Sequence, residues 1–218
     1  MLRCHFEDEH LLVLEKPSGL LCVPGRGPDK QDCLSARALN IWPDALVVHR
    51  LDQATSGLVL MARSAAVQRT LSSAFADRQV AKTYVAVVQG EMTPGSADDP
   101  GGWSIIDLPI AADWARRPLR VICMDTGKAS QTRWRPLAGA APIGATRLEL
   151  EPLTGRTHQL RVHMAALGHP ILGDALYGGA LYGGDAVSSA RLLLHASTLA
   201  FGHPVSGATL RVDSRAPF

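Results

Sequence analysis

Residues 49–63 read HRLDQATSGLVLMAR, in which a polar loop joins the apolar, β-prone runs 45–48 and 58–62. Strands at both ends of this loop would hold the Asp52 carboxylate on a rigid scaffold. Arg50, two residues earlier, would favour the ionised form of that carboxylate. Asp52 is therefore a candidate for chemistry, although an Asp in a loop also commonly closes an Asx turn.

The composition is that of a globular protein. With 218 residues, 46% of them hydrophobic, and a mean hydropathy of +0.06, the chain can build one sizeable core or two small lobes. Its apolar runs are too short to cross a bilayer and its N-terminus, MLRCHFEDEH, lacks the apolar centre of a signal peptide, so we expect a cytoplasmic protein. The four cysteines form no C-x-x-C pair, which argues against a zinc knuckle or a redox motif.

The net charge of +2 is small, so a polyanion would have to be recognised by a local patch. One stretch, residues 116–135, is strongly basic. Its cations are Arg116, Arg117, Arg120, Lys128, Arg133 and Arg135, against the single acid Asp125. Such a segment could follow an RNA backbone, or it could be a solvated face that keeps edge strands from aggregating.

Further apolar or β-branched runs predict strands at 11–14, 82–89, 119–124, 130–135 and 145–150. Gly57 can supply the positive φ that the loop after Asp52 often needs. The segment 93–102, rich in Pro, Gly and Asp, is the expected linker between two lobes. The ALYGG motif at 175–179 repeats at 180–184 and indicates a glycine-rich surface loop.

Three amphipathic patterns predict helices, each with a capping side chain before it. The expected caps are Asp32, Ser64 and Thr157, and the apolar stripes are Leu34-Ala38-Ile41, Val67-Leu71-Ala74-Phe75 and Leu160-Met164-Leu167, respectively. Gly168 and Pro170 would end the third helix, which places Arg161 about one turn after His158.

Common catalytic motifs do not fit this sequence. His158, His163 and His169 stand five and six residues apart, whereas zinc helices place their ligands four apart, so we expect no metal site. A phosphate-binding G-x-x-x-x-G-K-[ST], a G-x-S-x-G elbow and a Rossmann glycine fingerprint do not occur in the sequence. Asp52 also lacks the second motif that an aspartic protease needs.

Taken together, the longer motifs resemble a known family. HRLDQATSGL around Asp52, KTYVAVVQG around Tyr84, and TGRTHQLRVHMAALGHPILGD around Arg161 are similar, in order and spacing, to the three signature motifs of the RluA family of RNA pseudouridine synthases. KPSGLLCVPGR, DLPI, TGKASQT and RLLLHA extend the resemblance over most of the chain. The resemblance implies that Asp52, Tyr84 and Arg161 are catalytic. It also implies that Arg50 fills the space left by the extruded uridine.

The same resemblance implies an α+β fold, with a mixed, largely antiparallel sheet in two lobes around a central catalytic cleft. We expect one catalytic domain over residues 1–218, without the S4 RNA-binding domain of many relatives. The implied reaction detaches uracil from C1′ and reattaches it through C5, and it needs no cofactor and no metal. The implied partners are a tRNA anticodon stem-loop and a 23S ribosomal RNA hairpin, bound by a monomer.

We expect the RNA contacts to come from basic side chains, namely Arg50, Arg116, Arg117, Arg120, Lys128, Arg156 and His158. Two alternatives stay open. A catalytically inactive RNA-binding or RNA-folding protein could use the same scaffold. A glycosidase-like hydrolase would also place a carboxylate near a sugar C1′, but no second acid stands at a convincing position.

Overall fold

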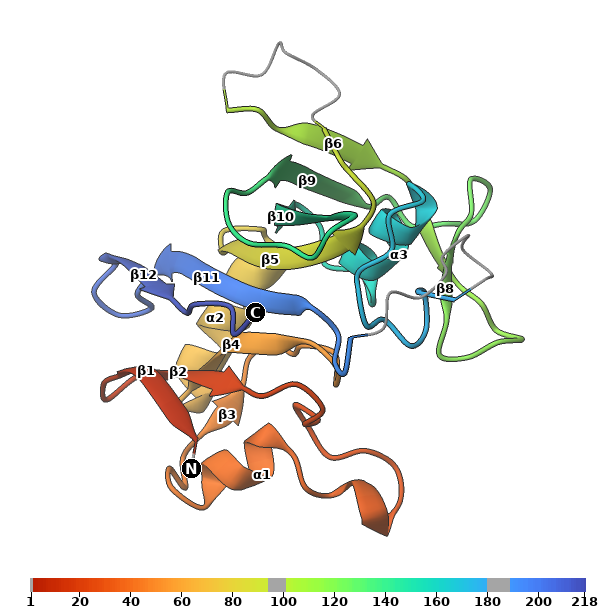
Figure 1. The fold of residues 1–218 in the computed structure, drawn as a ribbon. Helices are drawn as coiled ribbons and strands as arrows, with labels where there is room; N and C mark the ends of the chain where they lie inside the picture. The colour runs from red at the N-terminus through yellow and green to blue at the C-terminus, as the bar shows by residue number, and fades with distance from the viewer. Residues whose placement is uncertain (1, 94–100, 180–188) are drawn as a thin grey trace. The chain divides into compact units, whose positions relative to one another are not determined.

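The computed structural model describes residues 2–93, 101–179 and 189–218, which form two compact units (Figure 1). The first unit comprises Met1–Lys82 and His195–Phe218, and the second comprises Thr83–Leu194. Strand pairing is antiparallel throughout these units except between one pair of strands, so the expected α+β class with a largely antiparallel sheet is confirmed.

The first unit is built around a completely buried strand. This strand, β4 (Ser56–Ala62), pairs antiparallel with β2 (Leu11–Lys16) and β3 (Leu46–Val47), and parallel with β11 (Leu194–Gly202). At the two margins, β1 (Arg3–Glu7) pairs with β2, and β12 (Thr209–Asp213) pairs with β11. Every residue of β4 is buried, which explains why its sequence is a continuous apolar run rather than an alternating one.

Helix α2 (Ala65–Ala76) covers the core of the first unit, as its sequence pattern predicts. Val67 and Leu71 are buried against Leu58 and Leu60 of β4, with Phe75 packed beside them. Ser64 caps the helix, since its side chain accepts a hydrogen bond from the Val67 N–H. The predicted cap and the predicted stripe of this helix are both confirmed.

The other two predicted caps are wrong. Helix α1 (Leu34–Leu39) is capped by the Cys33 thiol, while Asp32 forms an ion pair with Arg37 instead. The last helix, α3 (Gln159–Ala166), starts two residues after Thr157, and a 3-10 turn, η1 (Pro28–Lys30), precedes α1. Before α3, the side-chain oxygen of Gln159 accepts from the Arg156 N–H, so a polar residue inside the helix closes the turn that Thr157 was expected to close.

The second unit contains antiparallel strands in the order β5 (Ala81–Gln89), β10 (Ala145–Pro152), β9 (Gln131–Pro136) and β6 (Ser104–Asp107). A separate hairpin pairs β7 (Ile110–Ala112) with β8 (Arg120–Ile122). Helix α3 packs against this hairpin through Val162, Ala165 and Ile110. The strands expected at 82–89, 119–124, 130–135 and 145–150 are thus present with small shifts at their ends.

Segment 93–102 is not the linker between the units, which corrects our expectation. The chain passes from one unit to the other after Lys82 and again after Leu194, so residues 93, 101 and 102 belong inside the second unit, between β5 and β6. Residues 94–100 and the second ALYGG copy at 180–184 lie outside the described residues. Among the described helices, none has the length and apolar character that a membrane span requires.

Gly57 provides a test of this packing. It has a φ of 117° in β4, opposite Ala196 of β11, and a Cβ atom there would collide with the Ala196 carbonyl oxygen. We expect Gly57→Ala to lower the free energy of unfolding by about 3 kcal/mol or more, since backbone strain and a clash between strands add together. Urea denaturation followed by circular dichroism would measure this loss.

The matched control is Gly19→Ala. Gly19 also has a positive φ, of 87°, but a Cβ atom there meets nothing within 4 Å. Only the backbone strain of about 1–2 kcal/mol should remain. Equal losses in the two variants would contradict the close approach of β4 and β11.

Candidate functional site

A buried lysine holds the loop that carries Asp52. Lys16, the last residue of β2, is fully buried, and its Nζ donates to the carbonyl oxygens of Pro17, Leu20 and Gln53 at 2.9, 2.7 and 2.9 Å. Because Gln53 directly follows Asp52, this ammonium fastens the segment after β2 to the candidate loop.

Further hydrogen bonds between the two segments fix the backbone on both sides of Asp52. The Gly19 N–H donates to the Gln53 carbonyl at 2.9 Å, and the Gln53 side chain donates back to the Gly19 carbonyl at 3.0 Å. The Ser18 hydroxyl donates to the Ala54 carbonyl at 2.7 Å. On the other side, the Leu51 N–H donates to the Cys22 sulfur at 3.1 Å. Asp52 itself is half-buried on this braced loop.

His49, at the start of the same motif, supports the loop from the core side. Its Nε2 accepts the Leu60 N–H at 2.9 Å, and its ring stacks on Phe75 with centroids 4.3 Å apart. Burial, with a smaller effect of the nearby Lys82 ammonium, lowers the pKa of His49 from 6.5 to about 3. His49 is therefore a neutral acceptor at physiological pH. Arg50, its neighbour, is exposed.

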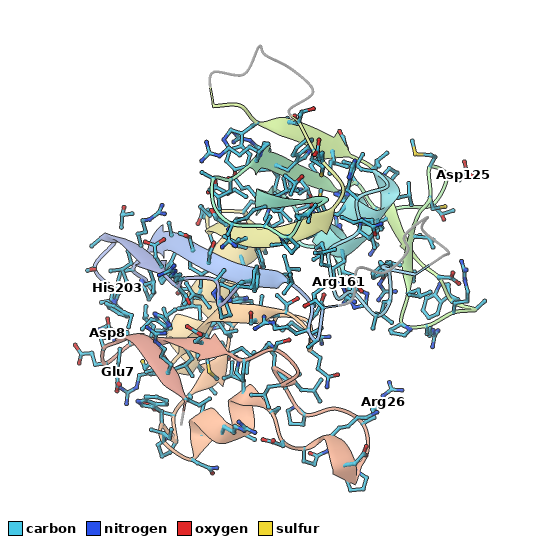
Figure 2. All side chains as sticks on the ribbon, viewed as in Figure 1. Glu7, Asp8, Arg26, Asp125, Arg161 and His203 are labelled. Atoms are coloured by element: carbon cyan, nitrogen blue, oxygen red, sulfur yellow. The ribbon has the colours of Figure 1, made fainter. Side chains whose placement is uncertain are left out.

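In the second unit, Arg161, labelled in Figure 2, is held by a buried ion pair. Its Nε and Nη2 donate to the two carboxylate oxygens of Asp174 at 2.7 and 2.6 Å, and the two side chains are 5% and 0% exposed. Asp174 also accepts the N–H groups of Leu176 and Tyr177. A bidentate pair of this kind fixes the plane and direction of the guanidinium.

Tyr177 connects the Arg161 pair to the β7–β8 hairpin. Its hydroxyl accepts the Arg120 N–H of β8 at 2.9 Å and lies 2.8 Å from Nδ1 of His158, the residue before α3. The Arg161 guanidinium lies 5.2 Å from the centre of the Tyr177 ring. Arg120, His158 and Arg161 are thus brought together around one buried tyrosine.

The remaining predicted catalytic residue, Tyr84, lies half-buried in β5, opposite Leu150 of β10. Tyr84 and Arg161 belong to the second unit, and Asp52 and Arg50 belong to the first. A site shared by Asp52, Tyr84 and Arg161 is therefore still a prediction.

The basic segment 116–135 divides into neutralised and unneutralised parts. Arg133 and Arg135 of β9 form ion pairs with Glu151 and Glu149, their cross-strand partners on β10, and Arg116 pairs with Asp113. Arg117, Arg120 and Lys128 have no carboxylate partner among residues 2–93, 101–179 and 189–218. Arg156 is exposed, and its Nε donates to the Ala129 carbonyl at 3.3 Å.

His163 of α3 and His169, three residues after the helix, are both hydrogen-bonded within the second unit. The two ring nitrogens of His163 lie 2.9 Å from the Thr132 hydroxyl and 2.9 Å from the Leu108 carbonyl oxygen. Nδ1 of His169 lies 2.8 Å from the Gln89 carbonyl oxygen. Within the described part of the chain, no group of three or more His, Cys, Asp or Glu side chains is placed to hold a metal ion.

Sequence reasoning missed four residues of these assemblies, namely Lys16, His49, Asp174 and Tyr177. A signal was present for three of them, because Lys16 opens the KPSGLL motif, His49 opens HRLD, and Asp174 ends HPILGD. Tyr177 lies in the ALYGG motif, whose glycines indicated a surface loop, yet its side chain is completely buried.

Comparisons with known proteins agree with this description. The family model of RNA pseudouridylate synthase matches residues 10–166. The dual-specificity RNA pseudouridine synthase RluA of Yersinia pestis is 43% identical over 98% of both chains, and that of Escherichia coli K12 is 42% identical over 98% of this chain and 92% of the relative. Human RNA pseudouridylate synthase domain containing 1 has a similar structure, with a TM-score of 0.79 and 28% identity over all of this chain and 84% of that one.

The neutral state of His49 predicts a pH dependence of stability. Between pH 3 and pH 6.5 the unfolded chain binds a proton at this residue that the folded protein excludes, so the free energy of unfolding falls as the pH falls through this range. We expect His49→Gln, whose amide can still accept the Leu60 N–H, to reduce the slope near pH 5.5 by about 1 kcal/mol per pH unit. Urea denaturation on either side of that pH measures the slope. An unchanged slope would mean that His49 is protonated in the folded protein.

The buried pair of Arg161 and Asp174 predicts a large effect of removing one charge. Asp174→Asn keeps an oxygen for the Leu176 and Tyr177 N–H groups but removes the negative charge beside Arg161. We expect a loss of about 3–5 kcal/mol in the free energy of unfolding. The control is Asp213→Asn, whose pair with Arg211 is more than half exposed and should contribute under about 1 kcal/mol. Similar losses at both positions would contradict a tightly held Arg161.

Proposed function

Because this chain belongs to the RNA pseudouridylate synthase family, we propose that it isomerises specific uridines in tRNA and large-subunit ribosomal RNA to pseudouridine. Asp52, Tyr84 and Arg161 form the catalytic site in this proposal. The observation that carries it is the loop of Asp52. Its backbone is braced at Leu51, Gln53 and Ala54, which supports a role for Asp52 that needs a rigid loop.

The first requirement of the reaction is access to the target base. A uridine inside a stem-loop is stacked and cannot rotate, so it must be flipped out at a cost of a few kcal/mol. Arg50 is exposed next to the loop of Asp52, and its planar guanidinium can stack where the base had been. This stacking offsets part of the cost of extrusion.

Asp52 then acts in its ionised form. Three routes fit a carboxylate at this position: attack on the sugar, attack on the base, or removal of a sugar proton. In each route the glycosidic bond at C1′ breaks, the uracil turns, and a bond forms from C1′ to C5. C5 loses a proton and N1 gains one, so the product is an isomer of the substrate and the reaction needs neither a cofactor nor a metal.

Arg161 and Tyr84 have complementary roles in this proposal. In this proposal Arg161 supplies a positive charge to the catalytic site, and its two hydrogen bonds to Asp174 fix the orientation of the guanidinium. Tyr84 offers an aromatic surface for the uracil and a hydroxyl near C5.

The substrates follow by similarity to the dual-specificity relatives. We propose a tRNA anticodon stem-loop and a 23S ribosomal RNA hairpin, bound by a monomer in the cytoplasm. We propose that residues 1–218 form one catalytic domain, which contributes RNA contacts through its own surface. Arg117, Arg120, Lys128, Arg156 and His158 are the proposed contacts, and Arg116 contributes less because Asp113 neutralises it.

Tritium release tests this function directly. RNA labelled at C5 of uridine loses its tritium when C5 becomes bonded to C1′. We expect the unsubstituted protein to release tritium without strand breakage or free uracil, and Asp52→Asn to release none while it binds RNA within a few fold of the parent. The exposed Asp29→Asn is the matched control, and it should release tritium at the parental rate.

The alternatives give different outcomes in the same assay. A catalytically inactive RNA-folding protein would bind the RNA and release no tritium in any variant. A hydrolase would free uracil that still carries tritium. Release by Asp52→Asn at the normal rate would remove Asp52 from the catalytic site.

A further inference from the structure

The tip of the β7–β8 hairpin, residues 113–119, carries an exposed aromatic ring paired with a cation. The Trp114 side chain is 71% exposed, which is unusual for an indole in a folded protein. The Arg117 guanidinium lies 3.9 Å from the centre of the indole ring. Most of this large apolar surface is therefore open to a partner.

The turn that presents Trp114 is well defined. The Asp113 N–H donates to the Leu119 carbonyl at 3.1 Å, and the Leu119 N–H donates to the Arg116 carbonyl at 3.0 Å. The Asp113 carboxylate accepts both the backbone N–H and the side-chain Nε of Arg116, at 3.1 and 2.7 Å. Asp113 and Arg116 thus close the turn and neutralise each other, whereas Arg117 is left to stack on the indole.

The hairpin tip also has a firm base in the second unit. Leu119, at the end of the tip, packs with Ile110 and Ile122 against Val162 and Ala165 of α3. One residue later, the Arg120 N–H donates to the buried Tyr177 hydroxyl, whose ring lies beside Arg161. A ligand held at the tip is therefore held on the same framework as a proposed catalytic residue.

A second tryptophan in the same unit shows what distinguishes the tip. Trp103 lies under two guanidinium groups, those of Arg133 and Arg135, at 4.6 and 4.4 Å. Those arginines are neutralised by Glu151 and Glu149, and the Trp103 side chain is half-buried. The ring and the two cations of this cluster are therefore already paired with groups of the same unit.

At the hairpin tip the charges are not balanced in this way. In the part of the chain that the structure describes, Arg117 and Arg120 form no ion pair with a carboxylate, and neither does Lys128, which is hydrogen-bonded through its backbone to Ile110 of β7. An open aromatic ring beside an unneutralised cation, here Arg117 on Trp114, is a combination that binds unpaired nucleotides, with the base on the ring and a phosphate at the cation.

We propose that the hairpin tip is a stacking site for an unpaired nucleobase of the RNA substrate, distinct from the target uridine. Trp114 stacks on the base, and Arg117 contacts a neighbouring phosphate. The site deepens the proposed function, since it rests on RNA being the substrate. It gives the enzyme a preference for looped over fully paired RNA, because only an unpaired base can expose its face to the indole.

Equilibrium binding of two RNAs tests the site: a stem-loop with unpaired bases and the fully paired duplex of the same stem. We expect Trp114→Ala to weaken stem-loop binding about 5- to 150-fold, the range for one lost stacking contact, and to leave duplex binding unchanged. Trp114→Phe keeps an aromatic face and should stay within about threefold of the parent. The control Ile105→Ala removes another exposed apolar side chain, 63% exposed on β6, and should bind as the parent does.

Salt dependence separates the two side chains of the site. Trp114→Ala should leave the slope of log affinity against log salt unchanged, whereas Arg117→Ala should reduce it by about one. Stem-loop binding by Trp114→Ala that matches the parent, or an equal loss on duplex RNA, would overturn the stacking site. If the parent protein is a dimer and Trp114→Ala is a monomer with unchanged RNA affinity, the ring belongs to a contact between two copies of the chain. That result would also overturn the stacking site.

Failure of this site and failure of the proposed function give different results. Tritium release by the unsubstituted protein tests the proposed function alone and does not depend on the role of Trp114. If the protein releases tritium and Trp114→Ala binds normally, only the stacking site is wrong. If it releases none but Trp114→Ala loses affinity for the stem-loop, the stacking site stands and the catalytic assignment falls.

Discussion

The buried ammonium of Lys16 is the constraint on which the candidate loop depends. Transferring a charged amine from water to the protein interior costs free energy, and hydrogen bonds formed inside the protein must offset that cost. Lys16 has three donor protons, and the carbonyls of Pro17, Leu20 and Gln53 accept from its nitrogen. The chain can satisfy this lysine only when the segment after β2 and the loop after Asp52 adopt one mutual geometry. A buried charge thereby fixes the backbone of the loop that carries the candidate residue Asp52.

The second unit uses the opposite arrangement for the same purpose. There a buried carboxylate, Asp174, fixes a candidate catalytic cation, Arg161, and is itself fixed by two backbone N–H groups. Ionic groups serve here better than apolar packing would, since hydrogen bonds have direction and packing contacts have little. In the proposed function, a side chain fixed in this way would not have to reorganise during the reaction. The two candidate residues are thus positioned by partners that do not themselves belong to the predicted catalytic set.

The sequence predicts those features that depend on neighbouring residues. The buried strand β4, the α2 stripe with its Ser64 cap, and the strands of the second unit follow from local periodicity and composition. The missed features depend on residues far apart in the chain. Arg161 and Asp174 are separated by a helix end and a turn, and a lysine ending a strand gives no sign that it is buried. The cap at Cys33 was missed because Asp32 is the better capping residue by preference, yet Arg37 engages it.

In the basic segment 116–135, the number of cations overstates the charge that a partner would meet, because some of these cations form ion pairs. Six cations in residues 116–135 indicate a broad RNA-binding face, but strand register places Arg133 opposite Glu151 and Arg135 opposite Glu149. Cross-strand neutralisation removes these two from the field that an RNA would meet, and Asp113 removes most of the effect of Arg116. Among the described cations of this segment, only Arg117, Arg120 and Lys128 form no ion pair with a carboxylate. A segment with six cations therefore presents three unneutralised charges, a difference that the strand register creates and that a count of basic residues in the sequence does not reveal.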